Sequence, residues 1–171
     1  MRIMTPVHVR YMCLFDHPAV ALIDAACHGD TAWSRADLRA ALCVPGCMGW
    51  VATVEDGGGH RGEAVIAYCL YTAHPQYVQL ERLAVAPGYW RRGVARQLVE
   101  RLQAMLRTGR RGRTRLVADV PEGRTPAQLL LRALGFLAIG LLADRSGATA
   151  YRFVYDAVEP AEEAVVRFGD N

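Results

Sequence analysis

The segment LAVAPGYWRRGVARQL, residues 83–98, constrains the fold of this chain more than any other stretch. Its apolar start predicts a strand, Pro87 and Gly88 predict a tight turn, and the periodic residues from Val94 onward predict a helix. The first N–H groups of a helix have no partner inside the helix. A loop that enters a helix here therefore offers a site for an anion such as phosphate, and the arginines of the loop add positive charge.

Length and composition indicate one globular domain. The chain has 171 residues, of which 52% are hydrophobic and 22% charged, and we predict a single domain over residues 1–156 with a tail over 157–171. The net charge of +3 does not require a nucleic-acid or membrane partner, and no apolar run approaches the roughly 20 residues that span a bilayer. The five cysteines follow neither a disulfide framework nor a zinc-ligand spacing, so we expect free thiols, no metal and a cytoplasmic protein.

Hydrophobic periodicity predicts alternating strands and helices along the chain. The expected strands are 7–12, 50–55, 63–73, 77–85, 115–120, 136–142 and 150–155. The expected helices are 16–27, a short helix opened by a capping box at Ser34, 92–107, and one from Thr125 to Gly135. In the first helix the predicted apolar face carries Ala19, Leu22, Ile23 and Ala26.

This order predicts an α/β fold with a mixed, mostly antiparallel sheet and helices on both faces. The helix between strands 77–85 and 115–120 forms a crossover, so these two strands form a parallel pair. Ligands of open sheets gather beyond the carboxyl ends of parallel strands. In this chain that region follows Val85 and Val120.

The loop before the third helix differs from the common nucleotide-binding motifs. It lacks the Gly-Lys-Ser/Thr of a P-loop, and it lacks the third glycine and the later acidic residue of a dinucleotide fingerprint. Gly93 and Ala95 are small enough for a phosphate to approach the backbone. Taken alone, the loop is also compatible with an ordinary helix start that carries solvated arginines.

The strand, loop and helix resemble the acetyl-CoA pyrophosphate loop of the GNAT superfamily of N-acetyltransferases. The aliphatic strand end, Pro87, Tyr89, Gly93 and Ala95 match the family pattern, and a second motif matches from Ala127 to Gly135-Phe136. The resemblance implies the family's sheet, with the parallel strand pair splayed around acetyl-CoA. It implies a cofactor site made of the following residues: Leu83, Ala84, Val85, Arg91, Arg92, Gly93, Val94, Ala95 and Arg96.

The chain is most similar to the ribosomal-protein-alanine N-acetyltransferase group, with several changes at polar positions. The group's general-base Glu corresponds to Asp119, its general-acid Tyr to Leu131, and its cofactor-contacting Asn to Arg124. Trp90 stands where the family has Gln or Arg. The resemblance implies direct transfer of an acetyl group, in a ternary complex, to a primary amine on a small molecule or a peptide N-terminus.

Two acidic residues are candidates for the general base. Asp119 could take the ammonium proton through a water, or it could simply cap nearby N–H groups at a strand end. Glu81 lies on the strand beside the expected thioester, and its alternative is a surface role or an ion pair with Arg82. Tyr151 or Tyr155 could protonate the leaving thiolate, although both also suit simple packing.

Two other function classes remain open at this point. Leu131 cannot act as an acid, which leaves room for a weakly catalytic or non-catalytic acyl-CoA-binding module. The basic segment from Arg107 to Arg115 could contact nucleic-acid phosphates, but no aromatic residues alternate with its arginines to stack bases. A solvated loop is therefore the expected role of this segment.

Overall fold

The computed structural model describes residues 6–56, 62–108, 112–143 and 147–157. The helices are α1 (His17–His28), α2 (Arg35–Leu42), α3 (Val94–Arg107) and α4 (Thr125–Ala133), with 3-10 turns at Leu14–Asp16, Gly29–Thr31 and Pro87–Tyr89. The strands are β1 (His8–Tyr11), β2 (Cys47–Glu55), β3 (Glu63–Ala73), β4 (Tyr77–Val85), β5 (Arg115–Pro121), β6 (Leu137–Ala143) and β7 (Thr149–Asp156). The predicted order of elements is confirmed. Most of the predicted loop 56–62, turn 144–147 and tail 157–171 lies outside the described residues.

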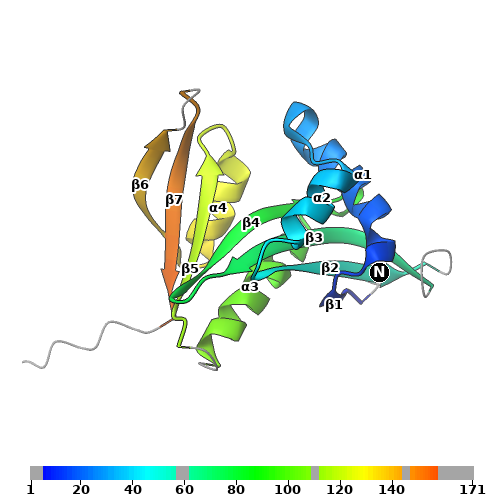
Figure 1. Cartoon of the computed structure of the whole chain (residues 1–171), viewed down its shortest axis with the longest axis horizontal. Coiled ribbons are helices and arrows are strands. Elements are labelled where there is room, and N and C mark those ends of the chain that lie inside the picture. The colour runs from blue at the N-terminus through cyan, green and yellow to red at the C-terminus, as the bar shows by residue number, and fades with distance from the viewer. Residues whose placement is uncertain (1–5, 57–61, 109–111, 144–146, 158–171) are drawn as a thin grey trace, which may run out of the picture.

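The described strands form one seven-stranded sheet in the order β1-β2-β3-β4-β5-β7-β6. Neighbouring strands run antiparallel except β4 and β5, which pair in parallel through the α3 crossover. The mixed sheet with one parallel pair confirms the predicted fold class. Figure 1 shows α1 and α2 on one side of the strands β2 to β4, with α3 on the other side.

The parallel pair is short, and the sheet opens beyond it. β4 and β5 are paired only from Tyr77 with Arg115 to Leu80 with Ala118. From there β4 continues to Val85 along β3, whereas β5 continues to Pro121 along β7. The sheet therefore divides into a leaf of β1 to β4 and a leaf of β5, β7 and β6 that diverge from this point (Figure 1).

A β-bulge in β4 coincides with the point of divergence. Leu80 pairs with Tyr71 of β3 and Arg82 pairs with Leu70, which leaves Glu81 as the extra residue. The bulge shifts the alternation of the strand. With regular alternation, Leu83 and Val85 would lie on the opposite face from Leu80. Instead Leu80, Leu83 and Val85 all pack on the α3 side, and Arg82 and Ala84 face α1. The sequence pattern did not reveal this shift.

Both faces of the central strands are buried. One core lies between the sheet and the helices α3 and α4, with Leu98 and Leu102 of α3 fully enclosed. A smaller core lies under α1 and α2 and includes Val20, Ile23 and Leu38. β3 is enclosed from Ile66 to Thr72, so this strand is covered on both sides.

The buried face of α1 differs from the predicted one. The residues that face the sheet are Val20, Ile23 and Asp24, whereas Leu22 is 73% exposed. The face turned to the sheet includes the carboxylate of Asp24, which binds Arg82 of β4 in the interior. A count of apolar residues could not anticipate a buried charge.

Helix α3 begins at Val94 rather than at Arg92. Gly93 has a φ of 78° and Arg91 a φ of 61°, so both lie in the left-handed region that a helix cannot include. Glycine adopts this conformation without steric cost. The loop therefore turns sharply just before the helix, and the free N–H groups of the first turn of α3 lie directly after that turn.

Candidate active site

The loop before α3 has the geometry of an anion site. The first hydrogen bond closed within α3 runs from the N–H of Gln97 to the carbonyl of Gly93, so the amides of Val94, Ala95 and Arg96 have no partner inside the helix. A Cβ on Gly93 would meet no atom within 4 Å. The space beside the backbone is open, as the close approach of a phosphate requires.

The three predicted loop arginines surround this helix start. Arg91, Arg92 and Arg96 are exposed; Arg92 stacks on the ring of Tyr89 at 5.1 Å, and Arg96 lies 3.5 Å from Glu100 one turn along the helix. An exposed pair at this distance leaves the guanidinium free to turn towards a ligand. Together with the helix dipole, these side chains make the loop a favourable place for a diphosphate.

Trp90 anchors the loop, a role that the sequence did not indicate. Its indole Nε1 donates to the carbonyl of Val85 at 2.6 Å, although the side chain is 54% exposed. The same carbonyl accepts from the thiol of Cys27 at 3.1 Å. Trp90 therefore fixes the loop to the end of β4 without using a side chain that could bind phosphate itself.

The predicted residues of β4 line the opening of the sheet. Leu83, Ala84 and Val85 pair with β3 along one edge. Their other edge faces away from β3, and no described strand pairs with it because β5 has turned aside after Ala118. A strand edge of this kind presents N–H and C=O groups that can bind an extended ligand.

The two predicted acids lie where the strands part. Glu81 directly follows Leu80 and Asp119 directly follows Ala118, and Leu80 with Ala118 is the last parallel pair. Glu81 is exposed, and it forms no ion pair with Arg82 or with any other described residue. Burial raises the pKa of the Cys47 thiol, and the charge of Glu81 adds to that rise.

Asp119 is held by an arginine. Nε of Arg152 donates to Oδ1 of Asp119 and Nη2 donates to Oδ2, both at 2.8 Å, and this bond raises the pKa of Arg152. Both carboxylate oxygens are thus engaged in a bidentate pair. Of the two acids, Glu81 has the freer carboxylate.

A polar hollow lies beside these acids on the face that α3 does not cover. On this face three cross-strand pairs of β5 and β7 follow one another: Arg115 with Asp156, Val117 with Val154, and Asp119 with Arg152. The hollow has a volume of about 550 Å³. It is lined by Gln76, Tyr77, Gln79, Gly112, Thr114, Arg115, Val117, Ile139, Arg152 and Val154.

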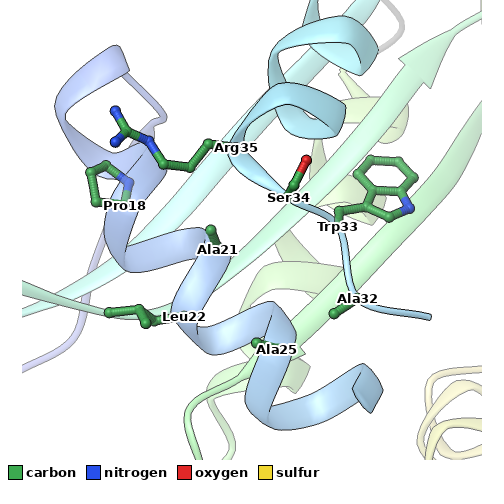
Figure 2. A pocket seen from close by; sticks show the side chains of 8 residues that line it. All are labelled: Pro18, Ala21, Leu22, Ala25, Ala32, Trp33, Ser34 and Arg35. Carbon is green, nitrogen blue, oxygen red and sulfur yellow. The ribbon is translucent and has the colours of Figure 1, made fainter. Parts of the chain in front are cut away.

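A second hollow, of about 540 Å³, follows the outer side of α1. Figure 2 shows Pro18, Ala21, Leu22 and Ala25 along the helix, with the segment from Ala32 to Arg35 opposite them. Its lining has no acidic group and no free thiol. It therefore lacks a proton acceptor for transfer chemistry.

A buried charge cluster joins α1 to β4 next to the bulge. Asp24 is 1% exposed, and it accepts from Nε and Nη2 of Arg82 at 2.7 and 2.8 Å, from the hydroxyl of Tyr68, and from the N–H of Trp33. Burial opposes the charge of Asp24, but these bonds outweigh it and hold its pKa below the usual value. Arg82 also donates to the carbonyl of Thr31 and lies over the ring of Trp33. The cluster fixes α1 against the strand that lines the opening.

His28 belongs to the edge of the same cluster. Its Nδ1 lies 2.8 Å from Oδ1 of Asp24, but the two atoms do not have hydrogen-bond geometry. Burial, followed by the charge of Arg82, lowers the pKa of His28, so the ring is neutral at pH 7. The charges of the cluster are therefore those of Asp24 and Arg82.

Of the other predicted positions, Leu131 and Tyr155 do not supply an acid at the opening, and Tyr151 is half-buried against the core beside Val120 of β5. Leu131 is buried in the core under α4, and Tyr155 packs on Phe136 and accepts from Arg107 at the end of α3. Arg124 reaches across the opening, where its Nη1 donates to the carbonyl of Cys27 at the end of α1. This contact joins the β5–α4 loop to α1.

The basic segment is largely engaged within the protein. Arg107 bonds to Tyr155, Arg113 to the carbonyl of His74, and Arg115 to Asp156, while Arg110 and Arg111 lie outside the described residues. Each of these described arginines thus has a partner within the protein, which disfavours a nucleic-acid surface along the segment, although Arg115 uses only its Nε. Among the described residues no cluster of side chains is suited to hold a metal ion, and no helix is long and apolar enough to cross a membrane.

We expect Gly93→Glu to weaken acetyl-CoA binding by about 10- to 100-fold. A glutamate at a φ of 78° is strained, and its carboxylate enters the open space where a phosphate would bind. Isothermal titration calorimetry measures the effect. The matched control is Gly140→Glu on β6, where a Cβ also meets open space; equal affinities of the two variants would contradict the assignment of the loop.

Comparisons with known proteins agree with this geometry. The model of the acetyltransferase (GNAT) family matches residues 19–136. No curated protein sequence matches significantly. The solved structures show the same fold. The ribosomal-protein-S18-alanine N-acetyltransferase of Escherichia coli has a TM-score of 0.74 at 21% identity, with 92% of this chain and 98% of that chain covered.

Two further solved structures are similar. Ard1 of Thermoplasma volcanium has a TM-score of 0.72 at 16% identity, covering 90% of this chain and 99% of its own. NAA60 of Arabidopsis thaliana, solved with acetyl-CoA, has a TM-score of 0.72 at 15% identity, covering 88% and 98%. At these identities the solved structures establish only the fold. The family model, in contrast, matches most of the sequence itself. The chain belongs to the acetyltransferase (GNAT) family.

Proposed function

We propose that this protein is an N-acetyltransferase that moves an acetyl group from acetyl-CoA to a primary amine by direct transfer in a ternary complex. The observation that carries the proposal is the opening between β4 and β5, which has the free N–H groups of α3 at one end and two carboxylates at its apex. Membership in the GNAT family and the acetyl-CoA bound to NAA60 support the choice of donor.

The residues present suit that donor. The loop 90–93 and the first turn of α3 would hold its diphosphate. The edge of β4 from Leu83 to Val85, apart from the Val85 carbonyl that Trp90 and Cys27 bind, would bind the extended pantetheine arm and donate to the thioester carbonyl. Acetyl-CoA supplies an acetyl group that is activated as a thioester. The residues of the chain hold the two substrates together and remove a proton from the amine.

A carboxylate at the apex would take that proton. The ammonium group loses one proton to the base before its nitrogen attacks. The N–C bond then forms and the C–S bond breaks, and the second proton of the nitrogen passes through water to the leaving thiolate, which gives the amide and the free thiol of coenzyme A. We assign proton removal to Glu81, whose carboxylate is exposed and unpaired among the described residues. Asp119, the base expected from the family resemblance, would instead hold Arg152 in position.

Two observations favour a second candidate function, an acyl-CoA-binding module with weak chemistry. Leu131 is buried in the core, and both oxygens of Asp119 are engaged by Arg152, so the two family positions for an acid and a base are unavailable. This candidate keeps the cofactor site and removes only the transfer. A turnover assay therefore distinguishes this candidate from an enzyme, whereas a binding assay does not.

Two measurements test the proposal. Calorimetry with acetyl-CoA is expected to give saturable binding, and absence of binding at millimolar concentration would exclude both candidates. A thiol-release assay over a panel of small amines and peptides is expected to give release that depends on the amine. Binding without release from any amine would favour the binding module.

A further inference from the structure

The hollow over β4, β5 and β7 has a lining whose charge is of one sign. Of the residues that line it, Arg115 and Arg152 are charged, and none is acidic. Its floor is apolar, formed by Val117, Val154 and Ile139, and its β4 side carries Gln79 and Tyr77. A hollow of this kind suits a ligand with a short carbon chain and a group that accepts hydrogen bonds.

Both arginines keep donors for a ligand. Arg152 uses Nε and Nη2 on Asp119, and Arg115 uses Nε on Asp156. A guanidinium has five N–H groups, so Nη1 of Arg152 and both Nη atoms of Arg115 are left, and no described residue accepts from them. The carboxylates behind the arginines also fix their planes, which reduces the entropy lost when a ligand binds.

The hollow adjoins the apex of the opening. Val117 lies two residues before Asp119 on β5, and Gln79 lies two residues before Glu81 on β4. A strand rises about 3.3 Å per residue, so the floor of the hollow is about 7 Å from the two acids. A small molecule or a short peptide segment can therefore reach both places at once.

We propose that the amine acceptor carries an anionic oxygen group, typically a carboxylate, which Arg115 and Arg152 bind in this hollow while the amine lies at Glu81. The inference rests on the proposed N-acetyltransferase function and specifies its substrate class. The source of the group is either a small amino acid or a peptide N-terminus with an acidic side chain close behind it. A diamine or a basic peptide would place a second cation against the arginines, so we expect it to be a poorer acceptor than its carboxylate counterpart.

Matched acceptors test the inference. The small-molecule series is 4-aminobutanoate, 4-aminobutanamide and 1,4-diaminobutane, which share one chain and differ in the charge of one end. The peptide series has an N-terminal alanine followed by two glutamates, two glutamines or two lysines. In at least one series we expect kcat/KM to fall about tenfold or more from carboxylate to amide, and again to ammonium. The series that shows this order identifies the source.

Substitutions in the hollow test whether its arginines cause the preference for a carboxylate acceptor. Arg115 pairs with Asp156 on the surface, so Arg115→Gln leaves the fold intact. It is expected to reduce the ratio of kcat/KM for the carboxylate acceptor over that for the amide acceptor several-fold. Arg132→Gln, which alters an exposed arginine of α4, is the matched control and keeps the preference.

A binding measurement distinguishes a failure of this inference from a failure of the proposed function. Calorimetry of the same acceptors with the protein saturated in coenzyme A is expected to give the same order of affinity without turnover. If that order holds but no amine releases thiol, the anionic site stands and the transferase function fails. If thiol is released but carboxylate, amide and ammonium acceptors behave alike in both series, or Arg132→Gln changes the preference as much as Arg115→Gln, the inference is overturned.

Discussion

Replacing Glu81 by glutamine is expected to lower kcat for acetyl transfer by about 100-fold, with little change in the affinity for acetyl-CoA. Glutamine keeps the size of the side chain and its place at the bulge, but it cannot accept the proton of the ammonium group. The remaining rate should rise with pH over the range in which the amine itself loses its proton. Steady-state thiol release across pH and calorimetry with acetyl-CoA measure the two effects.

Asp119→Asn is the matched comparison. Because Asp119 is already bound to Arg152 through both oxygens, we expect this variant to lose less than tenfold in kcat and to change chiefly the KM of the acceptor. The reverse result, a large loss of kcat in Asp119→Asn and a nearly normal Glu81→Gln, would assign the base to Asp119. The family resemblance pointed to that residue.

Replacing Asp24 by asparagine is expected to lower the free energy of unfolding by about 3 kcal/mol. The change leaves the charge of Arg82 buried without its carboxylate, and it weakens the bonds from Tyr68 and Trp33. Urea unfolding followed by circular dichroism measures the loss. The control is Asp156→Asn, which breaks a pair whose side chains are 62% and 46% exposed and should cost less than about 1 kcal/mol.

The pH dependence of the same variant provides a further check. The pKa of Asp24 in the folded protein lies below its unfolded value of about 3.9, so its contribution is complete above that pH and is lost as the pH falls through the folded pKa. The stability difference between the wild type and Asp24→Asn should therefore shrink as the pH is lowered below about 4. A difference that stays constant down to pH 2 would contradict the buried ion pair.

Local patterns predicted the elements and the cofactor loop because the relevant signals lie close together in the sequence. The strand, turn and helix of residues 83–98 are adjacent, and each has its own periodicity. The parallel pairing of β4 and β5 was also predictable, because the two strands and the crossover helix α3 follow one another in the sequence. The predicted acids, Glu81 and Asp119, also come together, since each follows the end of the parallel pairing.

Long-range electrostatics explain what was missed. Asp24 and Arg82 are separated by 58 positions, and neither has a local signal that names the other. The sequence did contain one local signal for the burial of Asp24: it lies one turn after Val20, on the face of α1 that is buried. The pair of Asp119 with Arg152 and the anchoring of Trp90 to Val85 likewise depend on contacts between segments, which periodicity does not encode.

For the fold, the bulge at Glu81 makes the number of residues in β4 more important than the side chain at that position. Deleting one residue there would restore simple alternation, turn Arg82 and Ala84 towards the apolar core under α3, and place Leu83 and Val85 beneath α1. Substituting Glu81 leaves every one of those orientations unchanged. The fold tolerates different side chains at position 81 but not a change in the number of residues, so an evolving sequence can exchange the group at the apex of the opening, and with it the chemistry, without rebuilding the sheet that holds it.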